Sequence, residues 1–162
     1  MVESLWWQTE FYKITNRLEK NMEHIVTTSG NMTLHSVRLH RGDDLLKSIK
    51  ELAQENHIKA GVVLSAVGCV VKAKLRDASG VTIRDIEEHC EIVSLNGTVS
   101  EKRCHLHLAL SKEDLTTIGG HMVEGCIINT TCELVIGELP DQQIDVEFDE
   151  ETGYKELIFK TI

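Results

Sequence analysis

One segment constrains the fold more than any other, because it carries the clearest helical pattern in a chain otherwise rich in short strands. It covers residues 43–56, where Asp43 is placed to cap the helix and Asn56 tolerates the geometry in which helices end. Its apolar face is formed at helical spacing by Leu45, Leu46, Ile49, Leu52 and Ala53. One main helix among many strands predicts an α+β fold, with a mixed or antiparallel sheet of about seven to nine short strands.

The strands are predicted from β-rich runs and the turn residues between them. Residues 26–39 hold two such pieces, separated by a turn at residues 29–31. Residues 62–67 form a continuous apolar run, typical of a strand covered on both sides, and Gly68 is expected at a bulge. The remaining strands are expected at residues 71–75, 91–100, 105–110, 116–124, 127–139, 145–148 and 154–159.

The first 21 residues differ from the rest of the chain. Trp7, Phe11, Ile14 and Leu18 recur at helical spacing, so residues 1–21 are predicted to be an N-terminal extension with helical character. Such a stripe could bind a partner or stack on nucleic acid. We favour packing on its own domain or on a neighbouring subunit, which is what apolar helical faces usually do. Residues 22–162 then form one domain, as the length of 162 residues allows.

Charge and composition narrow the class of protein. The chain has 26 acidic and 17 basic side chains and a net charge of −9, and shows no basic cluster of the kind that binds phosphate backbones tightly. The basic residues that could meet DNA are Lys72, Lys74 and Arg76, which alternate along a strand, together with Lys102 and Arg103. These charges are few, so DNA binding is expected to be weak. Five cysteines without a CxxC pair, no membrane-length apolar run and no signal-peptide pattern predict a cytoplasmic protein with no membrane partner.

Three histidines form the most suggestive chemical pattern. On a strand, His105 and His107 share one face about 7 Å apart at the backbone, while Leu106 faces the other way. A hairpin centred near Glu113 would place His121 on the next strand, close to His105. Three neutral imidazoles can hold a metal and leave one position for water or a small anion. The alternative is that all three are ordinary polar residues on a solvent-facing surface.

Other side chains are weaker candidates. Zinc is the divalent metal ion that we expect first at imidazole ligands, although iron, nickel or copper also fit. Glu124 and Glu133 are candidates for a general base or for hydrogen-bond partners of the ligands, and His89 is a further imidazole. Cys104 should point to the opposite face from His105. The sequence contains no nucleophile elbow, phosphate-binding loop or dinucleotide-binding glycine pattern.

Several segments, in order and spacing across residues 33–158, resemble one family. They are Arg41–Leu46, Ala60–Gly68, Glu91–Thr98, Gly119-Gly120-His121 with Glu124-Gly125, Glu133 with Gly137–Pro140, and Thr152-Gly153-Tyr154. The chain resembles a standalone prokaryotic member of the plants-and-prokaryotes-conserved domain family, which also occurs in plant AT-hook nuclear proteins. The resemblance implies a compact α/β domain, a homotrimer and a DNA-associated regulatory role.

The sequence also departs from the plant members of that family. It lacks the Arg-Gly-Arg-Pro of an AT-hook, and Glu88-His89-Cys90 stands where plant members carry Gly-Arg-Phe. The partner recruitment linked to that motif is therefore not expected, whereas prokaryotic members resemble this chain in their histidines. Two functions follow: a trimeric regulatory module with a three-histidine metal site, or a metal-dependent enzyme of hydrolase or lyase type acting on a small molecule.

Overall fold

A computed structural model describes residues 23–29 and 32–162. The predicted extension at residues 1–21 lies outside the described residues. The described elements are β1 (Glu23–Ser29), β2 (Met32–His40), α1 (Leu45–Glu55), β3 (Gly61–Arg76), β4 (Ile83–Ile86), β5 (Cys90–Val99), β6 (Cys104–Ser111), β7 (Thr117–Met122), β8 (Ile127–Glu138), β9 (Gln142–Phe148) and β10 (Lys155–Thr161). The α+β class with an antiparallel sheet and one helix is confirmed.

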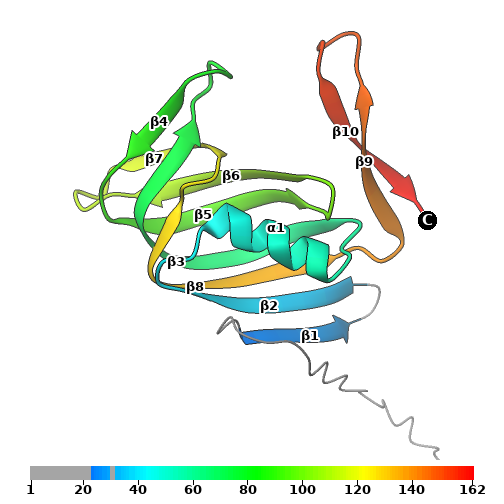
Figure 1. Cartoon of the computed structure of the whole chain (residues 1–162), viewed down its shortest axis with the longest axis horizontal. Coiled ribbons are helices and arrows are strands. Elements are labelled where there is room, and N and C mark those ends of the chain that lie inside the picture. The colour runs from blue at the N-terminus through cyan, green and yellow to red at the C-terminus, as the bar shows by residue number, and fades with distance from the viewer. Residues whose placement is uncertain (1–22, 30–31) are drawn as a thin grey trace, which may run out of the picture.

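The strands form an eight-stranded sheet in the order β1-β2-β8-β3-β5-β6-β7, with β4 paired to β3 (Figure 1). The long strand β3 changes register against β8 after Gly68, which confirms the predicted bulge. Beyond this point the end of β3 pairs with β7, through Leu75 opposite Met122 and Arg76 opposite His121. The sheet therefore curls, so that β7, its last strand, comes back to pair with the end of β3.

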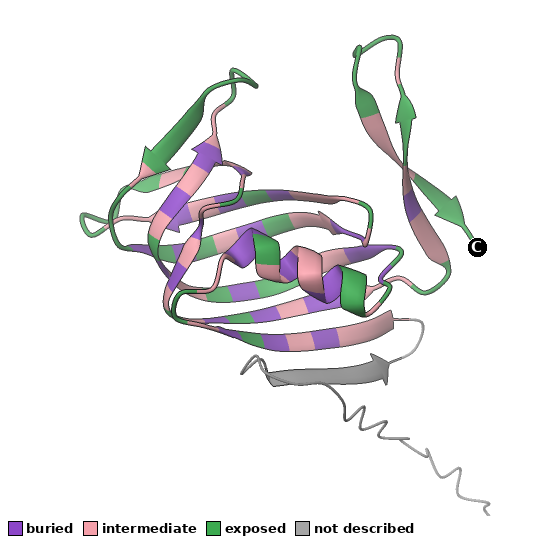
Figure 2. Ribbon diagram, viewed as in Figure 1, coloured by how far each residue is buried: buried purple, intermediate pink, exposed green. Residues whose placement is uncertain are grey.

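The helix lies across one face of this curled sheet (Figures 1 and 2). Its five buried residues are the five predicted from spacing, and Ile49 is fully buried. The cap differs from the prediction. Asp44, not Asp43, caps the helix by accepting a hydrogen bond from the Lys47 amide at 3.1 Å, whereas Asp43 accepts one from the His40 amide at 2.8 Å. Asp43 thus stabilises the turn before the helix, and Asp44 is the residue that caps it.

The prediction that residues 62–67 are covered on both sides is wrong for the described part of the chain. Ala66 is buried, but Leu64 and Val67 are 50% and 58% exposed. Residues 62–67 are apolar almost throughout because some of their side chains face the core and the others form an apolar surface on the outside of the chain. The short exposed strand β4 was not predicted, since its charged centre at Arg84 and Asp85 resembles a loop.

Strands β9 and β10 form a separate hairpin that projects from the same side of the sheet as the β3–β4 hairpin (Figure 1). Its base is fixed to the domain, because Ile144 is 1% exposed and its amide donates to the Lys59 carbonyl at 2.9 Å. Within the described residues, we find no helix with the length and apolar character needed to cross a membrane.

Candidate metal centre

The three predicted histidines meet on one face of β6 and β7. His107 lies directly opposite His121, and His105 lies one step along the same face, with ring centroids 5.2–5.5 Å apart among the three. Their ligand nitrogens all lie within 4.8 Å of one another. The predicted register was wrong by one pair on that face, since His121 was expected opposite His105. The hairpin turn is centred one residue later than predicted, and this moves the pairing by two residues.

The row of opposed side chains continues beyond the histidines. Arg76 on β3 lies opposite His121, which in turn lies opposite His107 on β6. Directly opposed residues in antiparallel strands project to the same face, with Cβ atoms about 4.5–5.5 Å apart. The curl of the sheet therefore brings a guanidinium from residue 76 next to imidazoles that lie more than 30 residues later in the chain.

Glycine at position 120 makes this close approach possible. A Cβ atom at Gly120 would lie 2.7 Å from the Arg76 carbonyl oxygen and 3.4 Å from the Leu75 Cβ. Any side chain there would push β7 away from β3. The Gly119-Gly120-His121 string thus has a steric explanation, because the strand that carries His121 must pack against the backbone of Arg76.

The environment favours the uncharged form of two of the imidazoles, those of His105 and His121. Burial, followed by the charge of Arg76, lowers the pKa of His121 to about 4. Burial also lowers the pKa of His105, with further contributions from His107, Arg103 and Arg76, while Glu156 acts in the opposite direction. Neutral imidazole is the form that binds metal, so these two residues are ready to coordinate at neutral pH.

The donor set fits a metal ion. Tetrahedral zinc, about 2.0–2.1 Å from each imidazole nitrogen, holds those nitrogens roughly 3.4 Å apart. Here the three ligand nitrogens lie within 4.8 Å of one another, so the side chains must close by up to about 1.4 Å to share one ion. The Nδ1 atom of His121 is buried and has no hydrogen-bond partner among the described residues. A buried polar atom normally has a partner, so this nitrogen is one that a bound ion could satisfy.

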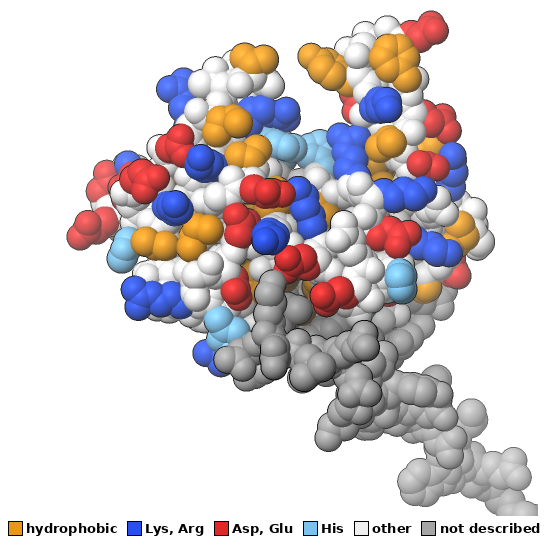
Figure 3. Space-filling model, in the orientation of Figure 1, with side chains coloured by type: hydrophobic (Ala, Val, Ile, Leu, Met, Phe, Trp, Pro, Cys, Tyr) orange, Lys and Arg blue, Asp and Glu red, His pale blue; other side chains and the backbone are white. Residues whose placement is uncertain are grey.

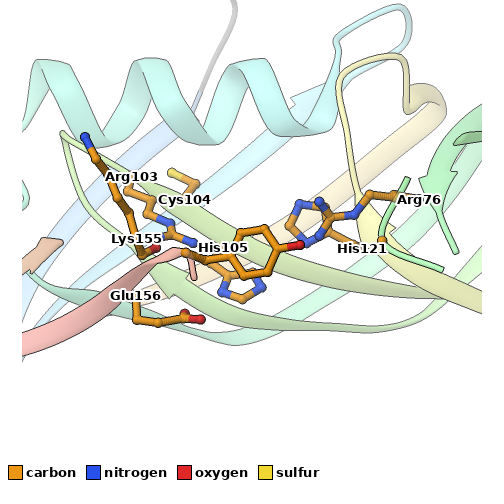
Figure 4. A pocket seen from close by; sticks show the side chains of 9 residues that line it. Arg76, Arg103, Cys104, His105, His121, Lys155 and Glu156 are labelled. Atoms are coloured by element: carbon orange, nitrogen blue, oxygen red, sulfur yellow. Dashed lines mark hydrogen bonds between the residues drawn. The ribbon is translucent and has the colours of Figure 1, made fainter. Parts of the chain in front are cut away.

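His105 and His121 line a cavity of about 500 Å³ between the two projecting hairpins (Figures 3 and 4). Its charged side chains are three cations and one anion: Arg76, Arg103, Lys155 and Glu156. Gly80 of the β3–β4 turn and Tyr154 of the β9–β10 hairpin line opposite sides. Arg103 donates from Nη1 to the Lys155 carbonyl at 2.9 Å and so links the cavity wall to the C-terminal hairpin.

The weaker candidates lie elsewhere. Glu124 accepts a hydrogen bond from Lys50 at 2.8 Å, and Glu133 accepts one from the Thr131 hydroxyl at 3.4 Å. His89 lines a different cavity of about 460 Å³. Cys104 does line the histidine cavity, but its thiol donates to the Ser100 carbonyl, and burial raises its pKa.

Sequence reasoning missed most of the cavity wall. Arg76 and Arg103 were identified only as basic residues that could meet DNA, and Tyr154 only as part of a family motif. Lys155 and Glu156 were not identified at all. No local signal links the C-terminal hairpin to the histidines, because the contact depends on where Ile144 anchors that hairpin.

Comparison with known proteins assigns the family. Residues 26–140 match the model of the Plants and Prokaryotes Conserved (PCC) domain, which accounts for more than half of the chain. The chain belongs to the PCC-domain family. The resemblance described from sequence motifs is therefore confirmed, and all three histidines lie within the matched residues.

Among sequence relatives, the chain is 37% identical over 128 residues to the bifunctional protein GlmU of Synechococcus sp. strain JA-2-3B'a(2-13). The alignment covers 79% of this chain and 20% of that protein, so the chain spans about a fifth of the length of the curated relatives it matches.

Two solved structures with PCC-like folds are also similar in sequence. A hypothetical protein from Salmonella cholerae-suis has a TM-score of 0.79 and 31% identity, covering 83% of this chain and 97% of its own. A metal-containing protein from Archaeoglobus fulgidus has a TM-score of 0.66 and 30% identity, covering 86% of this chain and 99% of its own.

Proposed function

We propose that this protein is a metal-binding PCC-domain module in which His105, His107 and His121 hold one divalent metal ion, with zinc as the first expectation. The supporting observation is the convergence of the three imidazoles, whose ligand nitrogens lie within 4.8 Å of one another. Two facts agree with it: the lowered pKa of His121 and the metal-containing nature of the Archaeoglobus relative. Zinc bound in this way supplies a Lewis acid with a free coordination position.

Metal content tests this proposal directly. Elemental analysis of protein purified without an affinity tag should give about one metal ion per chain, as expected for one set of three histidine ligands. His105→Ala and His121→Ala should each lose it. His57→Ala is the matched control, because the His57 side chain is 84% exposed and does not line the histidine cavity. Equal metal content in all four proteins would contradict the assignment.

Self-association into a homotrimer is part of the proposal. Strands β3 and β5 carry four exposed apolar side chains: Leu64, Val67, Val71 and Val93. Exposed apolar residues in such numbers are typical of subunit interfaces. Light scattering at micromolar concentration should give three times the chain mass, and Val67→Glu should reduce it. A monomer mass for the unchanged protein would refute the trimer.

A DNA-associated role is the family's implication, and we propose that direct DNA binding by this chain is weak. The net charge is −9, and several surface lysines already pair with carboxylates. Lys74 lies 3.2 Å from Asp85, and Lys160 lies 3.2 Å from Asp145. These pairs reduce the positive potential that a phosphate backbone would meet. A cytoplasmic location also belongs to the proposal, in keeping with five free cysteines.

A second candidate function is a metal-dependent hydrolase or lyase acting on a small molecule. The observation in its favour is the cavity of about 500 Å³ beside the histidines, whose wall carries the Glu156 carboxylate and the Tyr154 phenol. Ligand cavities of small-molecule enzymes fall in the range of about 300–1,000 Å³. Metal-dependent turnover that is lost in Glu156→Gln, with metal content unchanged, would favour the enzyme over a binding module.

A further inference from the structure

We propose that the histidine cavity binds a small organic anion, whose carboxylate or phosphate group pairs with Arg76 next to the metal centre. The inference rests on the proposed metal site and specifies the chemical class of its ligand. It starts from the position of Arg76, which follows His107 and His121 in a single row of opposed side chains. A ligand that approaches the open side of the histidines therefore meets a guanidinium at once.

Arg76 has hydrogen-bonding capacity that the described residues leave unused. Its Nε atom is buried and has no hydrogen-bond partner among them. Buried polar atoms in folded proteins nearly always have a partner, and an unmade bond to a charged group is costly. The planar guanidinium matches the geometry of carboxylate and phosphate oxygens, so an oxyanion is the ligand that would complete it.

The charge of the cavity favours an anion more broadly. Arg76 and Arg103 line the cavity together with a single carboxylate, Glu156, in a protein whose net charge is −9, while the Lys155 side chain extends away from the histidines. Figure 4 shows Arg76 beside His121 and Arg103 beside His105. Arg103 is held in place by its bond to the Lys155 carbonyl. A cleft lined mainly by cations focuses positive potential and so attracts a small anion, even in a protein that is acidic as a whole.

The size of the cavity selects a small organic molecule. A volume of about 500 Å³ is far larger than a single phosphate or bicarbonate ion needs, and it lies within the range of metabolite sites. Tyr154, which is 72% exposed, offers an aromatic surface for an organic group at the rim. Duplex DNA instead needs an extended basic surface, whereas here the cations lie inside a cavity between two hairpins.

The test uses the full chain loaded with Co²⁺, whose visible absorption reports changes in coordination. Succinate and glycerol 3-phosphate are the anionic probes for the carboxylate and phosphate forms, and uncharged succinamide is the neutral probe. The key variant is Arg76→Gln. Arg84→Gln is the matched control, because Arg84 lies on the neighbouring strand, bonded to Asp77 at 3.1 Å and 69% exposed. Metal content is measured in every sample.

We expect saturable spectral changes with at least one anionic probe and none with succinamide. Arg76→Gln should weaken binding about tenfold or more, as for loss of a charged hydrogen bond, while Arg84→Gln should stay within about twofold. The probe that binds more tightly identifies the carboxylate or the phosphate form. Metal content should be the same in both variants, because Arg76 is not one of the proposed ligands.

The other outcomes separate this inference from the metal proposal. A fully loaded protein that binds neither anion would overturn the anion site and leave the metal centre standing. Equal weakening by Arg84→Gln would mean that binding depends only on the total charge of the protein, and this would also overturn the anion site. Tighter, Arg76-dependent binding of a duplex oligonucleotide would overturn the small-molecule assignment. A protein that takes up no metal would refute the metal centre. Calorimetry with the same probes would then show whether the cavity binds anions through Arg76 in the absence of a metal ion.

Discussion

Replacement of Gly120 by alanine tests how the fold builds the centre. The added Cβ would lie 2.7 Å from the Arg76 carbonyl oxygen, which is backbone and cannot rotate away. Ordinary contact begins near 3.4 Å, so β7 must move by roughly 0.7 Å from β3. Two opposed residue pairs join β7 to β3, and one of them contains His121. The substitution therefore acts on the site through the strand that carries it.

The expected magnitude follows from overpacking, which costs about 1–3 kcal/mol in the free energy of unfolding. For a chain of this size, each kcal/mol lowers the melting temperature by about 2–4 °C, so Gly120→Ala should melt about 2–12 °C lower. Metal affinity should also fall, because His121 moves away from His105 and His107. Thermal unfolding with and without added Zn²⁺ measures both effects on the same sample.

Thr117→Ala is the control on the same strand. Thr117 is exposed and lies opposite Ser111 at the far end of β7, so its replacement should change the free energy of unfolding by no more than about 0.5 kcal/mol. If Gly120→Ala keeps both the melting temperature and the metal content of the unchanged protein, β7 does not depend on a glycine there, and the steric argument fails.

Three further predictions concern the core, acid and DNA. Leu106→Ala, at a side chain that is 1% exposed, should cost about 2–5 kcal/mol in unfolding measurements but leave metal content intact at low temperature, because Leu106 faces away from the histidines. In metal-free protein, the pKa of His121 is about 4 when folded and 6.5 as the ordinary value, so the unfolded chain takes up the proton first. Stability to urea should therefore fall as the pH drops from about 6.5 to about 4, and a His121→Gln variant that falls equally would contradict this. Finally, random-sequence duplex DNA should bind no more tightly than micromolar at an ionic strength of about 0.15 M, and submicromolar affinity in a fluorescence titration would show that the net charge of −9 misled us.

The histidine centre was predictable from sequence because side chains alternate between the two faces of a strand, so residues an even number of positions apart share a face. His105 and His107 share a face on any strand, and moving the hairpin centre by one residue shifts the pairing by two. A shift of two residues keeps His121 on the same face, so the cluster survived an incorrect register. The turn itself was harder to place, since Leu115 adopts a left-handed conformation with a φ of 65° that its residue type does not suggest.

The apolar face of the helix could be predicted from the sequence, whereas its cap and the cavity wall could not. Spacing identified the whole apolar face of α1, because a helix repeats its contacts within a few residues. It could not choose between Asp43 and Asp44 as the cap, since both are good capping residues and the choice depends on the turn before them. The positions of Arg76 and Glu156 beside the histidines depend on the curl of the sheet and the anchored hairpin, and no local pattern encodes either.

The strand order also determines when this domain can form during synthesis. Strand β2 and the first part of β3 both pair with β8, which begins 95 residues after the start of β2 and 66 residues after the start of β3. Until the ribosome has released β8, the apolar sides of β2 and β3 have no central partner, and α1 has only part of the sheet to pack against. Domains with such distant pairings fold slowly and late. The nascent chain therefore exposes its future core until nearly the whole PCC domain has been made, and unpaired strands exposed in this way are prone to aggregation.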